Sequence, residues 1–170
     1  MWGGQEDARS LEAIASAVDH GINWIDTAPI YGSGHSEIVV GKALRAMPAS
    51  RRAMVFTKFG LGLNADAPVR SASAPDVIAE CEASLTRLGV DRIDLYQLHA
   101  VDPRTPIETS VRALARLRDE GKIRDVGLCN VTVSQVRAAQ TIVSIASVQV
   151  SLSPFDDETE MGPLISHVQR

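Results

Sequence analysis

The sequence of 170 residues has little cysteine, few aromatic residues and no long apolar stretch. Its two cysteines, Cys81 and Cys129, lie far apart and match neither a metal-ligand spacing nor a disulfide framework. No apolar segment approaches the ~18 residues needed to span a bilayer, and charged side chains occur within the first ten residues, unlike a signal peptide. We therefore expect no metal site, no membrane segment and no leader, with the cytoplasm as the simplest location.

An excess of basic residues is also absent. Lys and Arg total 17 against 21 Asp and Glu, which gives a net charge of −4, and the basic residues are scattered along the chain. Nucleic-acid binding is therefore not expected as the main function. A content of 45% hydrophobic and 22% charged residues is typical of globular proteins and unlike disordered ones. Because domains commonly contain ~100–150 residues, we expect residues 1–170 to form a single domain.

Short apolar segments alternate with longer amphipathic segments, a pattern typical of βα units around a parallel sheet. It predicts about five strands and six helices. The expected strands are 22–26, 53–57, 93–98, 123–128 and 146–152. The expected helices are 10–20, 36–47, three that begin near Pro75, Thr105 and Thr132, and a sixth that reaches Arg170. The alternation alone fits a (β/α)8 barrel and a doubly wound open sheet equally well.

Local signals predict how two of these helices begin. Thr105 with Glu108 has the spacing of a capping box, and so has Thr132 with Gln135. Residues 60–74 are rich in Gly, Ala, Ser and Asp and are expected to form a long loop, either a surface lid or a simple connection.

Polar residues capable of chemistry follow the expected strands. Asp26, Lys58, His99 and Asn130 each stand at the end of a different one. In a (β/α)8 barrel the carboxyl ends of the strands meet at one rim, where catalytic groups are found. No glycine-rich dinucleotide fingerprint follows the first strand, which argues against a Rossmann fold. The sequence therefore favours the barrel.

Tyr31 lies shortly after Asp26 and completes a plausible acid–base set. A tyrosine ordinarily has a pKa near ~10 and gives up its proton poorly at neutral pH. A lysine such as Lys58 beside it favours the phenolate, and Asp26 balances the ammonium. The phenol could then protonate a carbonyl oxygen whose carbon receives a hydride, while His99 orients that oxygen and stabilises its developing charge.

Each of these residues alone has an ordinary explanation. Asp26 could initiate a turn, Lys58 could be solvated at a strand end, and His99 could be a structural histidine. Tyr31 could be a loop aromatic that covers the core. Their joint arrival at one expected rim favours a shared site.

Several segments resemble the landmark regions of the aldo-keto reductases. They are 25–37 (IDTAPIYGSGHSE), 56–60 (FTKFG), 96–99 (YQLH) with Asp102-Pro103, 126–130 (VGLCN) and 148–149 (VQ). Their order and spacing match the family, and the similarity covers essentially the whole chain. Because several independent motifs agree, the resemblance is specific.

The resemblance implies an incomplete TIM barrel that binds NADPH, or less often NADH, and reduces a small carbonyl substrate. The family's catalytic tetrad falls on Asp26, Tyr31, Lys58 and His99. The family's cofactor contacts fall on Asp26, Cys129, Asn130 and Gln149.

Other positions depart from the family or are less certain. Cys129 stands where the family usually has a serine, and Leu152 stands where an aromatic often stacks on the nicotinamide. Trp2, together with Tyr31 and His99, is expected to line the substrate pocket.

The resemblance also implies that the family's first strand precedes Trp2 and its last two strands follow Arg170. A barrel of this type usually has ~250 residues. Unclosed sheet edges carry unpaired backbone groups, so we expect either a fragment of a longer protein or a chain of marginal stability. Two alternatives to an enzyme stay open: a regulatory subunit of the potassium-channel β type and a truncated inactive remnant. The oligomeric state is open as well.

Overall fold

The computed structural model describes residues 6–64, 67–151 and 158–168. The helices are α1 (Asp7–Asp19), α2 (His35–Ala46), α3 (Ala74–Leu88), α4 (Ile107–Asp119), α5 (Val133–Gln140) and α6 (Glu158–Val168), with a short 3-10 helix η1 at Ala49–Arg51. The strands are β1 (Trp24–Asp26), β2 (Met54–Phe59), β3 (Leu61–Asn64), β4 (Ala67–Arg70), β5 (Ile93–Leu98), β6 (Ile123–Cys129) and β7 (Ile145–Gln149).

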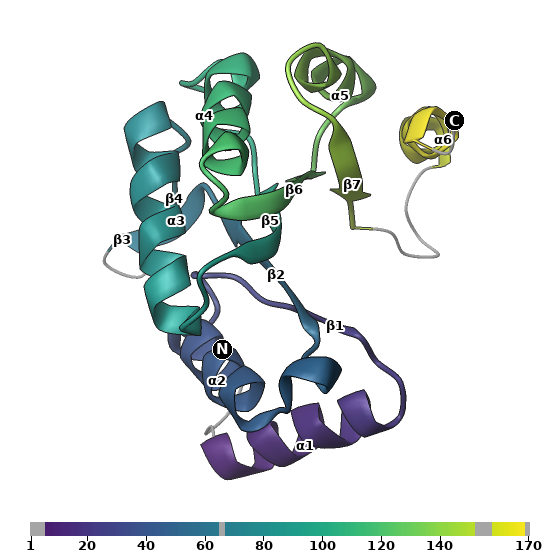
Figure 1. Cartoon of the computed structure of the whole chain (residues 1–170). Helices are drawn as coiled ribbons and strands as arrows, with labels where there is room; N and C mark the ends of the chain where they lie inside the picture. Colours follow the sequence, from purple (N-terminus) through teal and green to yellow (C-terminus); the bar gives the residue numbers. More distant parts are fainter. Residues whose placement is uncertain (1–5, 65–66, 152–157, 169–170) are drawn as a thin grey trace.

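The main sheet has five parallel strands in the order β1-β2-β5-β6-β7. Spatial order therefore follows chain order without the reversal that defines a doubly wound sheet. Figure 1 shows helices α2 to α5 following one another along one side of the curved sheet. The fold is the incomplete (β/α)8 barrel that the sequence predicts.

The strand register brings side chains of neighbouring strands to one level. Lys58 of β2 pairs with Gln97 of β5, which in turn pairs with Gly127 of β6. A Cβ atom on Gly127 would lie 2.8 Å from Cγ of Gln97, closer than real Cβ contacts. Glycine at this position therefore leaves the space in which the Gln97 side chain lies.

A single apolar core fills the space between the sheet and its helices. Among its fully buried side chains are Leu44, Val55, Cys81, Tyr96 and Leu114, which come from α2, β2, α3, β5 and α4. Residues that alternate with them along each strand face the opposite side of the sheet. The opposite side is where the chemically capable residues lie.

Helices α2 and α3 approach each other closely at a glycine. A Cβ on Gly41 would lie 2.4 Å from the carbonyl oxygen of Leu88, a backbone atom that cannot move aside cheaply. Arg45 donates a hydrogen bond to that same carbonyl. The C-terminal end of α3 is thereby held against α2.

The helix starts agree with the sequence in one case and differ in the other. Thr132 and Gln135 form the predicted capping box at α5. The box predicted from Thr105 and Glu108 is wrong, because α4 begins at Ile107 after Pro106 without a side-chain cap. The Thr105 hydroxyl instead donates to Asp102, whose carboxylate is already organised by Arg104.

Residues 60–74 were expected to form a long loop, and the two strands within them were not predicted. Strands β3 and β4 pair there as an antiparallel hairpin directly after β2. The Arg104 guanidinium donates both to Asp102 and to the carbonyl oxygen of Arg70. The base of the hairpin is thus tied to the segment that follows β5.

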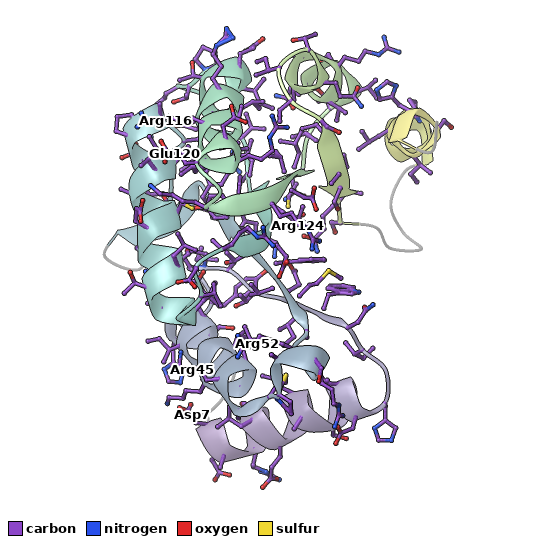
Figure 2. All side chains as sticks on the ribbon, in the orientation of Figure 1. Asp7, Arg45, Arg52, Arg116, Glu120 and Arg124 are labelled. Atoms are coloured by element: carbon purple, nitrogen blue, oxygen red, sulfur yellow. The ribbon has the colours of Figure 1, made fainter. Side chains whose placement is uncertain are left out.

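Charged side chains cover the outer faces of the helices. Figure 2 shows Arg116 of α4 and Glu120, which follows the last residue of that helix; the Nε atom of Arg116 lies 2.7 Å from Oε1 of Glu120. Pairs of this kind one turn apart stabilise an exposed helix only slightly. None of the described helices has both the length and the apolar character needed to cross a membrane.

Candidate active site

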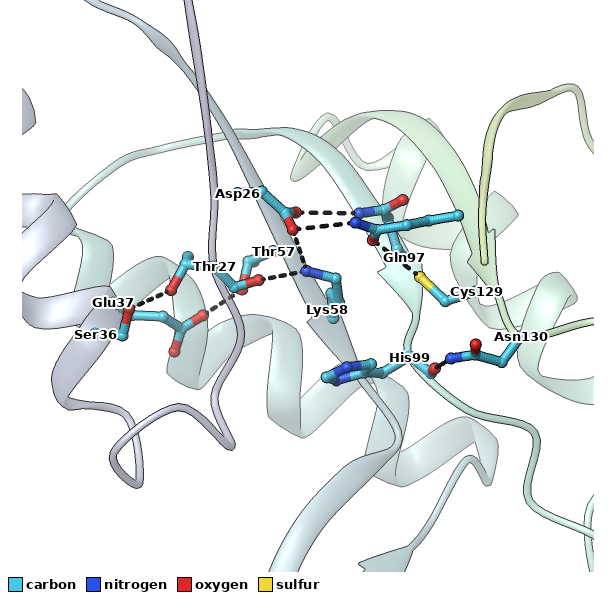
Figure 3. A network of polar contacts seen from close by, with 11 residues as sticks. Asp26, Thr27, Ser36, Glu37, Thr57, Lys58, Gln97, His99, Cys129 and Asn130 are labelled. Atoms are coloured by element: carbon cyan, nitrogen blue, oxygen red, sulfur yellow. Dashed lines mark hydrogen bonds and ion pairs between the residues drawn. The ribbon is translucent and has the colours of Figure 1, made fainter. Parts of the chain in front are cut away.

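The predicted catalytic residues come together at the carboxyl ends of the strands. Asp26 is the last residue of β1, Lys58 is the second-last of β2, and His99 directly follows β5. Tyr31 lies in the turn between β1 and α2. Figure 3 shows Asp26, Lys58 and His99 facing one space at this rim.

An ion pair lies at the centre of the site. The Lys58 ammonium donates to Oδ2 of Asp26 at 2.7 Å and to the backbone carbonyl of Thr27 at 3.0 Å. Lys58 is only 2% exposed. A buried ammonium is costly unless a charge and hydrogen-bond acceptors compensate it, and Asp26 with Thr27 supplies both.

Tyr31 and His99 lie beside this ion pair. Nζ of Lys58 lies 5.5 Å from the centroid of the Tyr31 ring. The centroids of the Tyr31 and His99 rings are 5.9 Å apart, and the two rings pack edge to face. Tyr31 is 43% exposed, so a ligand can reach it. Burial, and next the positive charge of Lys58, lower the pKa of His99 below its ordinary value.

The expected cofactor contacts lie on the neighbouring strand ends. The Gln149 amide contacts Oδ2 of Asp26 at 3.4 Å and accepts from the Cys129 thiol at 3.5 Å. Asn130 has a positive φ of 55°, and its side chain donates to the carbonyl oxygen of His99 at 3.0 Å. Burial raises the pKa of Cys129 to about 11, so its sulfur stays a protonated thiol at neutral pH.

The sequence interpretation missed a layer of residues behind these groups. Gln97, 2% exposed, reaches Oδ1 of Asp26 at 3.4 Å. Thr57 and Glu37 form a buried hydrogen bond of 2.7 Å beneath Lys58. Gln97 is part of the YQLH segment, and Glu37 ends the 25–37 segment. Their positions in these motifs could therefore have marked them as candidates, but the sequence does not show which residues they contact.

Two expected residues lie outside the described residues: Trp2, a substrate-pocket candidate, and Leu152, the counterpart of a stacking aromatic. Among the residues that the structure does describe, no group of three His, Cys, Asp or Glu side chains is arranged to hold a metal ion.

Fold and site together define a parallel α/β-barrel protein with a buried Lys–Asp pair, a tyrosine and a histidine at its carboxyl rim. The sequence profile of the Aldo/keto reductase family matches residues 1–168. The chain belongs to this family.

Curated relatives agree with this assignment. Aldo-keto reductase YhdN of Bacillus subtilis (strain 168) is 38% identical over 164 residues, which make up 96% of this chain and 50% of the relative. The probable aldo-keto reductase 1 of Glycine max is 36% identical over 94% of this chain and 46% of its own length. The chain spans about half the length of these curated relatives.

Solved structures show the same relationship. The glycerol dehydrogenase AKR11B4 from Gluconobacter oxydans superimposes with a TM-score of 0.87 at 39% identity, covering 98% of this chain and 52% of that one. An aldo-keto reductase from Klebsiella pneumoniae in complex with NADPH gives a TM-score of 0.79 at 28% identity, covering 96% and 55%. The five-stranded sheet therefore corresponds to part of a larger barrel in these proteins.

Proposed function

We propose that this chain carries the catalytic residues of an NAD(P)H-dependent reductase that converts aldehydes or ketones to alcohols. The observation that carries the proposal is the buried Lys58–Asp26 ion pair beside the ring of Tyr31, with His99 at the edge of that ring. This arrangement supports proton delivery from Tyr31 to a carbonyl oxygen. Family membership and the names of the relatives support it.

Tyr31 is the proposed proton donor. The Lys58 ammonium donates to Asp26 and Thr27, and its nitrogen lies 5.5 Å from the centroid of the Tyr31 ring, so its charge is close to the phenol. Positive charge at that position stabilises the phenolate left after proton transfer. The proton moves from the Tyr31 hydroxyl to the carbonyl oxygen as that oxygen gains negative charge, and the O–H bond of the alcohol forms.

His99 is proposed to orient the substrate. Its lowered pKa keeps the imidazole neutral at neutral pH, so one ring nitrogen carries a proton and can donate to the carbonyl oxygen. Nδ1 is enclosed and has no partner among the described residues, so we assign the substrate contact to Nε2. A neutral donor polarises the carbonyl without competing with Tyr31 as the acid.

The amide side chains at the rim fit a nicotinamide. A nicotinamide carboxamide offers one acceptor and two donors, which match the exposed amides of Asn130 and Gln149. We propose that these residues, with the Cys129 thiol and Asp26, hold that end of the cofactor. When bound, NADPH supplies the hydride. We propose NADPH rather than NADH, supported by the relative solved with NADPH.

A channel-type regulatory subunit and an inactive remnant are less well supported. The relatives described above are named as reductases or a dehydrogenase. All four residues of the tetrad are present in the chain. Three of them, Asp26, Lys58 and His99, lie at one rim in Figure 3. A small carbonyl compound is therefore the partner that we propose.

Replacing Lys58 tests the proposed chemistry. We expect Lys58→Met to lower kcat for NADPH-dependent reduction of small aldehydes by roughly 10²–10⁴-fold, because the phenolate loses its balancing charge. The matched control is Lys122→Met, since Lys122 pairs with Glu82 and Glu120 and directly precedes β6, at the opposite end of the strand from the rim. Circular dichroism checks folding, and NADPH fluorescence checks binding. Unchanged turnover in a folded Lys58→Met protein would refute the assignment.

A further inference from the structure

Glu37 is a fully buried carboxylate in the first turn of α2. Its Oε1 accepts from the Thr57 hydroxyl at 2.7 Å, and its Oε2 accepts from Nε of Arg87 at 2.6 Å. Burial of a charged group is costly, and these two partners offset that cost. The carboxylate thereby connects three elements: α2, β2 and α3.

The connection to β2 is made next to the central lysine. Thr57 precedes Lys58, and successive side chains of a strand point to opposite faces of the sheet. Thr57 therefore meets Glu37 on the helix side while Lys58 reaches Asp26 on the other side. Figure 3 shows both contacts on the same stretch of strand. A shift of β2 relative to α2 would consequently move Lys58.

The turn that bears Tyr31 is fixed at the same place. The amide of Ser36 donates to the carbonyl oxygen of Tyr31 at 3.2 Å, and the hydroxyls of Ser36 and Thr27 lie 2.8 Å apart. Ser36 is the neighbour of Glu37. The first turn of α2 thus holds the turn on one side and β2 on the other.

Arg87 reaches Glu37 through a gap left by a glycine. Gly34 has a φ of 90°, and a Cβ there would lie 2.8 Å from Cδ of Arg87. Arg87 also donates to the buried hydroxyl of Ser84 at 3.1 Å. The Arg87 guanidinium is therefore held by Ser84 of its own helix and by Glu37 of α2, and it fixes Glu37 against α3.

We propose that Glu37 is a positioning residue that sets the placement of Lys58 relative to Tyr31 by tying β2 to the start of α2. The inference rests on the proposed function for its catalytic consequence. The carboxylate does not touch the reacting atoms. Its effect passes through Thr57 to the backbone of Lys58, and through Ser36 to the turn that carries Tyr31.

Thr57→Val isolates the link. Valine has nearly the shape of threonine but lacks the hydroxyl, so the Glu37–Arg87 pair stays while the tie to β2 is lost and the buried Oε1 of Glu37 loses its Thr57 donor. Thr57→Ser keeps the hydroxyl and serves as the conservative comparison. Val111→Ala is the control for lost stability alone, because Val111 is fully buried in α4, an element that contributes no residue to the Glu37 link.

In activity assays we expect Thr57→Val to lower kcat by roughly 10–100-fold while KM for NADPH is unchanged, because misplaced catalytic groups slow the chemical step. Thr57→Ser should keep most of the parent kcat. Val111→Ala should keep it as well at temperatures where the protein is folded. A Thr57→Val protein with the parent kcat would overturn the proposal.

Amide hydrogen exchange provides a readout that does not depend on turnover. We expect Thr57→Val to lose protection at Tyr31, His35 and Ser36, whose amides bond within the turn, while Thr57→Ser and Val111→Ala keep it. Unchanged exchange in Thr57→Val, or the same loss in Val111→Ala, would overturn the positioning role. If the parent protein shows no turnover, the proposed function fails, and hydrogen exchange still decides whether Glu37 holds the turn.

Discussion

Two tyrosines of this chain show how position decides what a residue can do. Tyr31 is partly exposed beside Lys58 and His99, whereas Tyr96 is fully buried against Phe59, and its hydroxyl has no partner among the described residues. Burial raises the pKa of Tyr96 well above the ordinary value. Tyr96 is therefore unfit for proton transfer, although it lies only a few residues from His99 in the sequence.

The buried Cys81 thiol makes the stability of the fold sensitive to alkali. Burial raises its pKa from about 9 to about 12. The unfolded chain therefore releases this proton first as the pH rises. The contribution to stability is complete below pH 9 and is lost progressively between pH 9 and 12, by up to about 1.4 kcal/mol per pH unit.

Replacing Cys81 with alanine tests this dependence. We expect denaturant unfolding of Cys81→Ala to show a smaller fall in the free energy of unfolding between pH 7 and pH 10 than the parent shows. The cost of the cavity left by the replacement is the same at both pH values, so it cancels in the comparison. Equal falls in both proteins would show that Cys81 does not titrate as described.

At the scale of elements, the alternation of apolar and amphipathic segments was sufficient to predict the βα units, and β5 has its predicted bounds. The hairpin β3–β4 was not predictable in this way. Its strands are short and include Gly62 and Pro68, residues that weaken a strand pattern. Lys58, His99 and Asn130 could be expected at one rim because parallel strands end together.

The contacts that fix the site could not be predicted in the same way. Glu37 reads as an ordinary helix-terminal charge in the sequence, yet it is buried because Thr57 and Arg87, distant in the chain, converge on it. Gln97 lies against Asp26 because Gly127, on the next strand, leaves the space. Both facts depend on register and helix packing, which local patterns do not contain.

The two threonines of the predicted capping boxes give a direct test at this scale. The Thr132 hydroxyl accepts from the amide of Gln135, whereas Thr105 caps no helix. We expect Thr132→Ala to lower the free energy of unfolding by about 1 kcal/mol. Thr105→Ala should cost less, since its only side-chain hydrogen bond is the long contact with Asp102 in the described structure. Denaturant unfolding measures both, and a larger cost for Thr105→Ala would contradict the helix starts.

At the scale of the whole molecule, the site is assembled from strands that lie far apart in the sequence. Asp26 and Gln149 contact each other across more than a hundred residues because β1 and β7 are the outer strands of a curved sheet. The carboxyl ends of both strands therefore contribute to one site. The relatives extend well beyond this chain, which spans about half of their length. We propose that the residues described here supply the acid–base groups and the nicotinamide contacts.

The central claim is that Tyr31 delivers the proton, and Tyr31→Phe tests it most directly. The matched control is Tyr96→Phe, which removes a buried hydroxyl without a partner among the described residues. Steady-state reduction of a small aldehyde with NADPH should fall by roughly 10²–10⁴-fold in Tyr31→Phe, with the fold and NADPH binding retained, while Tyr96→Phe keeps the parent rate. A Tyr31→Phe protein that reduces the aldehyde as fast as its parent would contradict the account.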